Sequence, residues 1–227
     1  MASRPKVQRF MTVDALVACY PKLYHMAERD TWPSIKVNGL LSTSAALDRM
    51  GIQGAQRRLL EREHRPEKVP IGPVGQQIVL RDQKPMPPDR IADALIDGTT
   101  PQQWYKFLNG RVFMWAEERR LHGLLKARPY RKLEHDVLTI DTASLMAAYA
   151  PSVWLCRLNS GNTWPMPHPR GMADFLRIGA YPMKARVDKP QKAVVEVVVD
   201  DAIPDIANFV IEVRRMKGDV VLRQLPL

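Results

Sequence analysis

Apolar positions along the chain fall into many short segments, some with helical spacing and others with the alternation or β-branching that is typical of strands. The apolar residues between Val13 and Tyr20, for example, recur at helical spacing behind Thr12, and both Thr12 and Asp89 are expected to cap helices. Helices are predicted at residues 12–20, 32–38, 45–50, 54–65, 89–96, 100–108, 117–127 and 143–148. Strands are predicted at residues 23–26, 77–80, 111–115, 137–141, 153–158 and 193–199, before a closing hairpin of 209–216 and 220–225. Because these elements do not repeat as βαβ units, we expect an α+β fold.

The length of 227 residues fits one domain, and we expect residues 1–227 to form it, with residues 1–20 as an N-terminal helical lead-in. Residues 159–171 are rich in Gly, Pro and Asn and are predicted to form a long loop. No apolar run approaches the roughly 20 residues that span a bilayer. The basic N-terminus leads into no apolar segment of a secretory signal. We therefore expect no membrane association.

The chain carries 34 Lys and Arg against 24 Asp and Glu, a net charge of +10. This balance favours polyanionic partners such as nucleic acid, an anionic nucleotide or an acidic lipid surface, although a merely basic solvated surface has the same composition. Cys19 and Cys156 stand far apart among apolar neighbours, which indicates buried thiols in a reducing cytoplasm. Neither the cysteines nor the five histidines have the spacing of metal ligands, so no metal is expected.

The motifs of the commonest nucleotide-binding and hydrolytic enzymes are absent from the sequence. The chain has no GxxxxGK[ST] phosphate loop, no GxGxxG, no HExxH and no GxSxG. Classical P-loop, Rossmann, metalloprotease and α/β-hydrolase functions therefore lose their main support.

Two segments combine polar or aromatic side chains in a way that suits ligand binding. His25 lies on a predicted strand and is followed by the turn Asn38-Gly-Leu-Leu-Ser-Thr-Ser44, whose hydroxyl and N–H groups can bind ribose or amides. Arg111, Phe113 and Trp115 share one face of a later strand, where an aromatic ring beside a cation suits a stacked base near a phosphate. A structural histidine and a half-buried strand with an edge arginine are the simpler alternatives.

Glu196 stands in the middle of the β-branched strand Ala193–Val199 and shares a face with Val194 and Val198. An unpaired carboxylate is costly to bury, so its presence on an apolar face is typical of a site residue. A charge that protects an edge strand from pairing produces the same pattern.

Taken in order, the strand histidine with its N-G-L-L-S turn, the aromatic strand and the late V-x-E-x-x-V strand resemble the ADP-ribosyltransferase superfamily. More narrowly, they resemble the DarT-type nucleic-acid ADP-ribosyltransferases. The segments Arg81-Asp82-Gln83 and Asn159–Thr163 are similar to an uncharacterised bacterial family. The resemblance implies a split mixed β-core flanked by short helices, and cleavage of the nicotinamide–ribose bond of NAD through an oxocarbenium-like state.

The resemblance also implies roles for individual residues. Glu196 would hydrogen-bond the ribose 2′-OH and stabilise the positive charge, and Arg81 or Arg111 would bind the diphosphate or orient the acceptor. NAD binding is assigned to His25, Ser42, Ser44, Arg111, Phe113 and Trp115, with Phe113 or Trp115 stacked on the nicotinamide. Members that modify arginine carry Gln or Glu where this chain has Val194. This departure fits a nucleic-acid or other acceptor. With a net charge of +10 we expect nucleic acid, single-stranded and DNA before RNA, with the loop at 159–171 contacting it.

The sequence thus predicts an NAD-dependent ADP-ribosyltransferase that modifies nucleic acid, acting as a toxin or defence protein with a possible antitoxin partner. Two alternatives stay open. An NAD glycohydrolase or a protein-modifying relative would also depend on Glu196 but would label no nucleic acid. A non-enzymatic basic domain would bind nucleic acid or a protein in a salt-dependent way and would not consume NAD.

Overall fold

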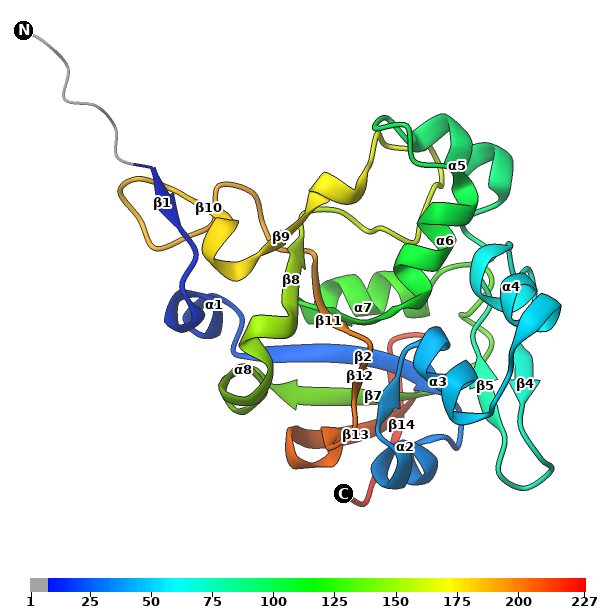
Figure 1. Cartoon of the computed structure of the whole chain (residues 1–227). Coiled ribbons are helices and arrows are strands. Elements are labelled where there is room, and N and C mark those ends of the chain that lie inside the picture. The colour runs from blue at the N-terminus through cyan, green and yellow to red at the C-terminus, as the bar shows by residue number, and fades with distance from the viewer. Residues whose placement is uncertain (1–7) are drawn as a thin grey trace, which may run out of the picture.

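The computed structural model describes residues 8–227 and has the α+β class that the sequence predicted (Figure 1). Residues 1–7, the start of the predicted lead-in, lie outside the described residues. The central sheet consists of β2 (Lys22–Glu28), β6 (Arg111–Trp115), β7 (Glu134–Asp141), β8 (Val153–Cys156), β9 (Phe175–Arg177), β11 (Glu196–Asp200), β13 (Val210–Lys217) and β14 (Val220–Leu225). Its spatial order is β14-β13-β7-β2-β6-β11-β8-β9, and each of these pairings is antiparallel, which refines the mixed core expected from the sequence.

The sheet divides into two halves between β2 and β6. Strand β2 pairs with β7 at seven positions, and β6 pairs with β11 at five. Between β2 and β6, in contrast, the described strands share the single register pair Tyr24↔Trp115. The two halves therefore separate beyond this point, and the backbone groups that face the gap are free to meet other partners.

One face of the sheet carries a core that runs across both halves. It includes Leu23 and Leu138 from one half and Met114 and Val197 from the other. Helices α1 (Val13–Cys19), α2 (Trp32–Asn38) and α8 (Thr142–Tyr149) contribute apolar side chains to it. Burial of this shared core holds the two halves together despite their sparse pairing.

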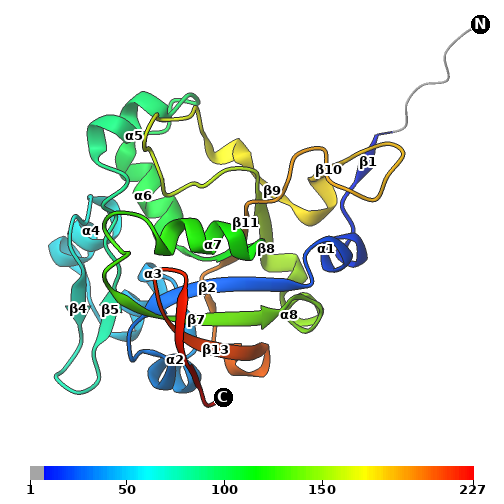
Figure 2. The ribbon, with the colours of Figure 1, turned by 180° about the vertical axis from the view of Figure 1, so that it is seen from behind.

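The opposite face is covered in two separate pieces. Leu121 and Leu125 of α7 (Glu118–Leu125) pack against Met26 in the half that contains β2. The view from behind shows α7 in front of the sheet, next to β2 (Figure 2). Helices α5 (Pro88–Ala94) and α6 (Pro101–Asn109) pack Ile91 and Trp104 against the other half. The gap in the sheet therefore lies between two helical covers.

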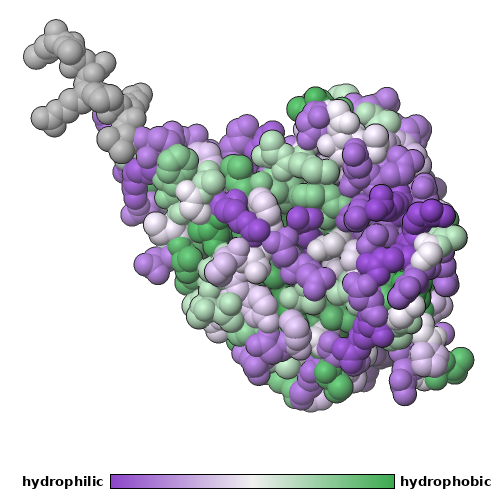
Figure 3. Space-filling view, in the orientation of Figure 1, coloured by the Kyte–Doolittle hydropathy of each residue, from purple (hydrophilic) through white to green (hydrophobic). Residues whose placement is uncertain are grey.

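A side layer of α3 (Thr43–Arg49), α4 (Gly54–Arg62), β4 (Val69–Ile71) and β5 (Ile78–Leu80) has its own small core. Four further short strands complete the described secondary structure, apart from 3₁₀ turns: β1 (Arg9–Phe10), β3 (Leu40–Leu41), β10 (Pro182–Met183) and β12 (Ala202–Ile203). Strand β10 pairs with β1. The space-filling view shows hydrophilic residues over the side of the molecule that carries α4, β4 and β5 (Figure 3).

Most predicted elements are present, and the differences have local causes. The helix expected to Arg65 ends at Arg62, before the first proline of the break. Asp89 lies in the first turn of α5 rather than at its cap, because the helix begins at Pro88. The strand expected from Ala193 begins at Glu196, so Glu196 is its first residue and not its middle. Strands β4 and β9, of three residues each, were not predicted.

The turn after α2 requires its glycine. Gly39 has a φ of 85°, and a Cβ atom at this position would lie 2.6 Å from the Cα atom of Pro204. A side chain would therefore push β3 away from β12, with which it pairs. Within residues 8–227, no helix combines the length and apolar character that crossing a membrane requires.

Candidate functional site

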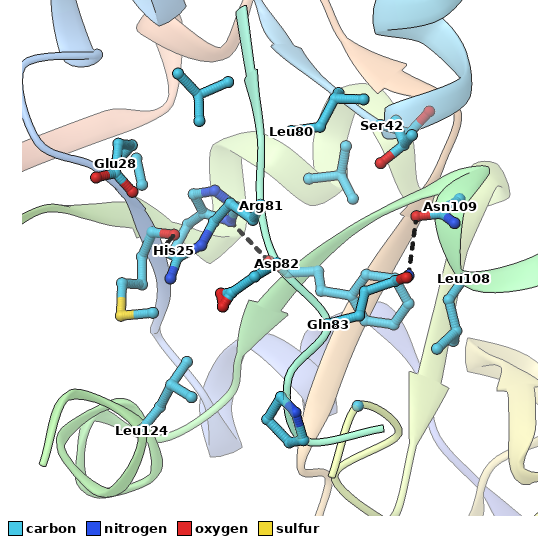
Figure 4. Close-up of a pocket in the computed structure, with 18 of the residues that line it drawn as sticks. His25, Glu28, Ser42, Leu80, Arg81, Asp82, Gln83, Leu108, Asn109 and Leu124 are labelled. Atoms are coloured by element: carbon cyan, nitrogen blue, oxygen red, sulfur yellow. Dashed lines mark hydrogen bonds between the residues drawn. The ribbon is translucent and has the colours of Figure 1, made fainter. Parts of the chain in front are cut away.

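A cavity of about 1090 Å³ follows the gap between the two halves of the sheet. Residues of β2, including His25, line one wall, and residues of β6 line the other. The segment after β5 crosses the cavity, and residues of the loop at 159–162 also line it (Figure 4). Of the eight site residues that the sequence suggested, seven line this cavity: His25, Ser42, Arg81, Arg111, Phe113, Trp115 and Glu196. The structure thus brings together residues spread over 172 positions of the chain (196 − 25 + 1).

Glu196 is buried at the start of β11, beside Trp115 on β6 and Cys156 on β8. Its Oε1 atom accepts a hydrogen bond of 3.1 Å from the backbone N–H of Ser160. Its Oε2 atom is buried and finds no hydrogen-bond partner among the described residues. A buried carboxylate oxygen without a partner is costly, so this atom is ready to accept a donor from a ligand.

Burial raises the pKa of Glu196 to about 7, although hydrogen bonds from Ser160 and the charge of Arg170 act in the opposite direction. At neutral pH the side chain is therefore divided between its acid and its carboxylate forms. A carboxyl group with this pKa can both stabilise a positive charge and take up a proton.

His25 faces Glu196's half of the sheet from β2. Its Nδ1 atom lies 2.8 Å from the carbonyl oxygen of Phe113 on β6, so the imidazole ring spans the gap where the strands no longer pair. Burial lowers the pKa of His25 to about 4, with a smaller contribution from Arg81. The ring is therefore neutral, Nδ1 carries the proton that the carbonyl accepts, and Nε2 is left as an acceptor.

Arg81 leads the segment that crosses the cavity, and Figure 4 shows Arg81, Asp82 and Gln83 in succession along it. One guanidinium nitrogen of Arg81 donates to the carbonyl of Met26 at 3.2 Å, and the group lies 5.3 Å from the ring of Tyr130. Within residues 8–227 no carboxylate lies within 4 Å of it in an ion pair. Its charge is thus available to an anionic ligand.

Arg111, Phe113 and Trp115 share one face of β6, as predicted, and it is the face of Glu196 because Glu196 pairs with Trp115. Arg111 is less available than Arg81. Its Nε atom lies 3.1 Å from Asp200, and its guanidinium group stacks on Phe107 at 3.8 Å. Of the two arginines that the sequence left open for a diphosphate, the structure therefore favours Arg81.

The two serines differ in placement. Ser42 lines the cavity, and its hydroxyl oxygen accepts from the N–H of Ala45 as the N-cap of α3. Ser44 donates to Glu61 at 2.7 Å and does not line the cavity. The structure therefore separates Ser44 from the other candidate residues.

Sequence reasoning missed a polar network behind the crossing segment. Arg65 is buried, and its guanidinium group donates to Asn109 at 3.0 Å and to the carbonyl of Arg81 at 3.2 Å. Gln83 accepts from the backbone N–H of Arg65 at 3.1 Å. This network fixes the segment over the cavity. A buried arginine inside a charged helical pattern looked like a surface residue, so no signal in the sequence distinguished it.

Residues 8–227 hold no group of three or more His, Cys, Asp or Glu side chains that is suited to bind a metal ion. The cavity can instead accept hydrogen-bond donors at Glu196 and His25, and an anion at Arg81.

A comparison with models of protein families identifies the family of this chain. A model of a family that is described as a family of unknown function (DUF7002) matches residues 21–210. The matched range includes β2, the crossing segment, the loop at 159–162 and Glu196. A search of curated proteins finds no match to the chain.

Proposed function

We propose that this chain, which belongs to the family of unknown function DUF7002, is an NAD-dependent ADP-ribosyltransferase that modifies nucleic acid. One observation carries the proposal: a buried glutamate with an unpartnered oxygen lines a large cavity, where an antiparallel sheet separates into two halves. A carboxylate in this position can accept a hydrogen bond from a ribose hydroxyl and face the positive charge that develops when the glycosidic bond breaks.

In the proposed reaction the bond between the ribose C1′ and the nicotinamide nitrogen breaks, and its electron pair leaves with nicotinamide. The acceptor then forms a new bond to C1′ with its own electron pair and loses a proton. Glu196, whose pKa is about 7, stabilises the oxocarbenium-like state as a carboxylate and can take up that proton. The step needs no metal and no further co-reactant.

The other cavity residues suit the parts of NAD. Neutral His25 offers Nε2 as an acceptor to a ribose hydroxyl or an amide N–H. Arg81, which has no carboxylate partner among the described residues, suits the diphosphate. Phe113 and Trp115 line the same wall as Glu196 and suit the nicotinamide ring.

A nucleic-acid acceptor is supported by charge and by the loop that lines the cavity. The net charge of +10 attracts a polyanion, and its effect depends on salt. Trp164 is 55% exposed at the cavity and is stacked at 3.8 Å by Arg90, so a base can stack on a ring that is already held. The proposal includes a toxin or defence role in the cytoplasm, with an antitoxin protein as the restraining partner.

The test measures nicotinamide release from NAD by the full chain, with no acceptor, with single-stranded DNA and with single-stranded RNA. The wild type is compared with Glu196→Gln, and with Glu212→Gln as a matched change on the other half of the sheet. We expect release that requires an oligonucleotide, and a loss of about a hundredfold or more in Glu196→Gln alone.

Each other outcome has its own meaning. Release without any acceptor would replace the proposal by an NAD glycohydrolase. Release that labels protein and no nucleic acid would overturn the acceptor. Nicotinamide release at the wild-type rate in Glu196→Gln would sink the mechanism, and salt-dependent binding of oligonucleotides without NAD consumption would leave a binding domain.

A further inference from the structure

The loop that lines the cavity is closed by one buried arginine. Arg170 is 1% exposed, and its backbone is tied to the end of α5, since its N–H donates to Ala94 at 2.8 Å and its carbonyl accepts from Ile96. The far end of the loop is thereby fixed to the helical cover. The guanidinium group then reaches back across the loop to its beginning.

The acceptors of this guanidinium group are all backbone carbonyls. Nη1 lies 3.2 Å from the carbonyl oxygen of Asn159 and 2.9 Å from that of Ser160. Nη2 donates to Asn162 at 2.8 Å, and Nε donates to His168 at 3.0 Å. No ion pair to Arg170 is formed within residues 8–227. Four bonds from one planar group leave the start of the loop little freedom.

The same contacts connect Arg170 to Glu196 through a single peptide group. The carbonyl of Asn159 and the N–H of Ser160 belong to one peptide unit, whose two ends point in opposite directions. Arg170 binds the carbonyl end, and Glu196 accepts from the N–H end at 3.1 Å. A cation at one end of this dipole and a carboxylate at the other stabilise each other's position.

We propose that Arg170 is a positioning residue for Glu196. Arg170 holds the peptide group between Asn159 and Ser160 so that its N–H fixes one carboxylate oxygen of Glu196 and leaves the other without a protein partner. This inference rests on the proposed function for its catalytic consequence. Its structural part, the control of the Glu196 carboxyl group by Arg170, can be measured without any reaction.

The ionisable groups around Glu196 come from three elements. Arg170 lies in the loop, Arg120 lies on α7, and the thiol of Cys156 lies on the neighbouring strand β8. Arg170 and Arg120 both lower the pKa of Glu196, whereas burial of Cys156 keeps its thiol protonated and uncharged. Loss of Arg170 therefore removes a favourable charge and loosens a favourable hydrogen bond, and both changes raise the pKa of Glu196.

The experiment compares Arg170→Lys and Arg170→Gln with Arg90→Gln. Arg90 is a matched control because it also donates to carbonyls of this loop, those of Thr163 and Pro165, without acting on Glu196. An NMR titration of isotope-labelled glutamate carboxyls follows Glu196, whose signal is identified by its loss in Glu196→Gln. The pH profile of nicotinamide release is recorded in parallel.

We expect the Glu196 pKa to rise in the order wild type, Arg170→Lys, Arg170→Gln, by about one pH unit in the last. The acid limb of nicotinamide release should move with it. Arg90→Gln should titrate as the wild type does. If Arg170→Gln does not fold, the contrast between Arg170→Lys and Arg90→Gln decides the question.

The inference is overturned if the Arg170 variants titrate with the wild type, or if Arg90→Gln shifts the pKa as much as Arg170→Lys. These results are distinct from failure of the proposed function. A wild type that consumes no NAD but shows the ordered titration would overturn the function and keep the control of Glu196. Nicotinamide release by the wild type, with the same Glu196 pKa in the Arg170 variants, would keep the function and overturn the control of Glu196 by Arg170.

Discussion

Each half of the central sheet buries a carboxylate, but only one of the two is paired with a cation. Asp136 on β7 is fully buried, and Arg215 donates to one of its oxygens at 2.6 Å while the N–H of Trp32 donates to the other at 3.2 Å. Glu196 on β11 is also buried, but it has one N–H partner and no ion pair within the described residues.

The contrast shows that burial of a charged residue does not by itself indicate a site. Asp136 and Arg215 form an ion pair that offsets their burial, and this pair stabilises the fold. Glu196 keeps an oxygen that the protein does not satisfy, next to a cavity that a ligand can enter. The unpaired oxygen, and not burial, is therefore what distinguishes Glu196 from Asp136.

The largest effect on stability is expected at Asp136. Asp136→Ala removes the fully buried partner of Arg215 and leaves this arginine with the exposed Asp30, also at 2.6 Å, so the free energy of unfolding should fall by about 3–5 kcal/mol. Urea denaturation followed by circular dichroism measures this loss. The double variant Asp136→Ala/Arg215→Met should recover part of it, because the cation that has lost its buried partner is then removed as well. A loss below about 1 kcal/mol in the single variant would contradict a structural role for the pair.

At Glu196 the burial of an unpaired carboxyl group predicts that stability depends on pH. The folded-state pKa of Glu196 is about 7, above the ordinary value of 4.5. The folded protein therefore binds a proton that the unfolded chain has released, and stability falls as pH rises between about 4.5 and 7. The wild type should lose about 3 kcal/mol over this range relative to Glu196→Gln, which has no proton to release.

This difference must be measured against the variant because two histidines act in the other direction. Burial lowers the pKa values of His25 and His135 to about 4, so their contribution to stability is lost as pH falls from 6.5 toward 4. Both histidines are present in Glu196→Gln, so subtracting the two pH series isolates Glu196. Parallel curves of stability against pH for the wild type and Glu196→Gln would show that burial does not raise the pKa of Glu196.

The comparison also explains which features the sequence made predictable. Local signals were sufficient for helices that carry their own caps, such as α6, where Thr100 and Gln103 form a capping box. The alternation along β6 placed Phe113 and Trp115 on one face, and the register with β11 adds Glu196 to that face. These features depend on neighbours in sequence or on the period of a strand.

Features that depend on distant partners were not predictable from one sequence. Ser44 resembles Ser42 in the turn, yet its hydroxyl meets Glu61 on α4 and lies outside the cavity. Arg170 looked like one more cation in an exposed loop, and its burial follows from four carbonyls spread over ten residues. Side-chain pairing across the fold decides these cases, and a periodic pattern contains no information about it.

The smallest effect is expected at Asp200, which lies on the same strand face as Glu196. Its carboxylate is met by Arg111 at 3.1 Å, by Arg177 at 3.0 Å and by the indole N–H of Trp154 at 2.9 Å, and its side chain is 34% exposed. Asp200→Asn keeps an oxygen for one of these donors, and partly exposed ion pairs contribute little. The unfolding free energy in urea should therefore fall by about 1 kcal/mol or less. A loss as large as that of Asp136→Ala would show that partner number, and not burial, determines what a carboxylate contributes to this sheet.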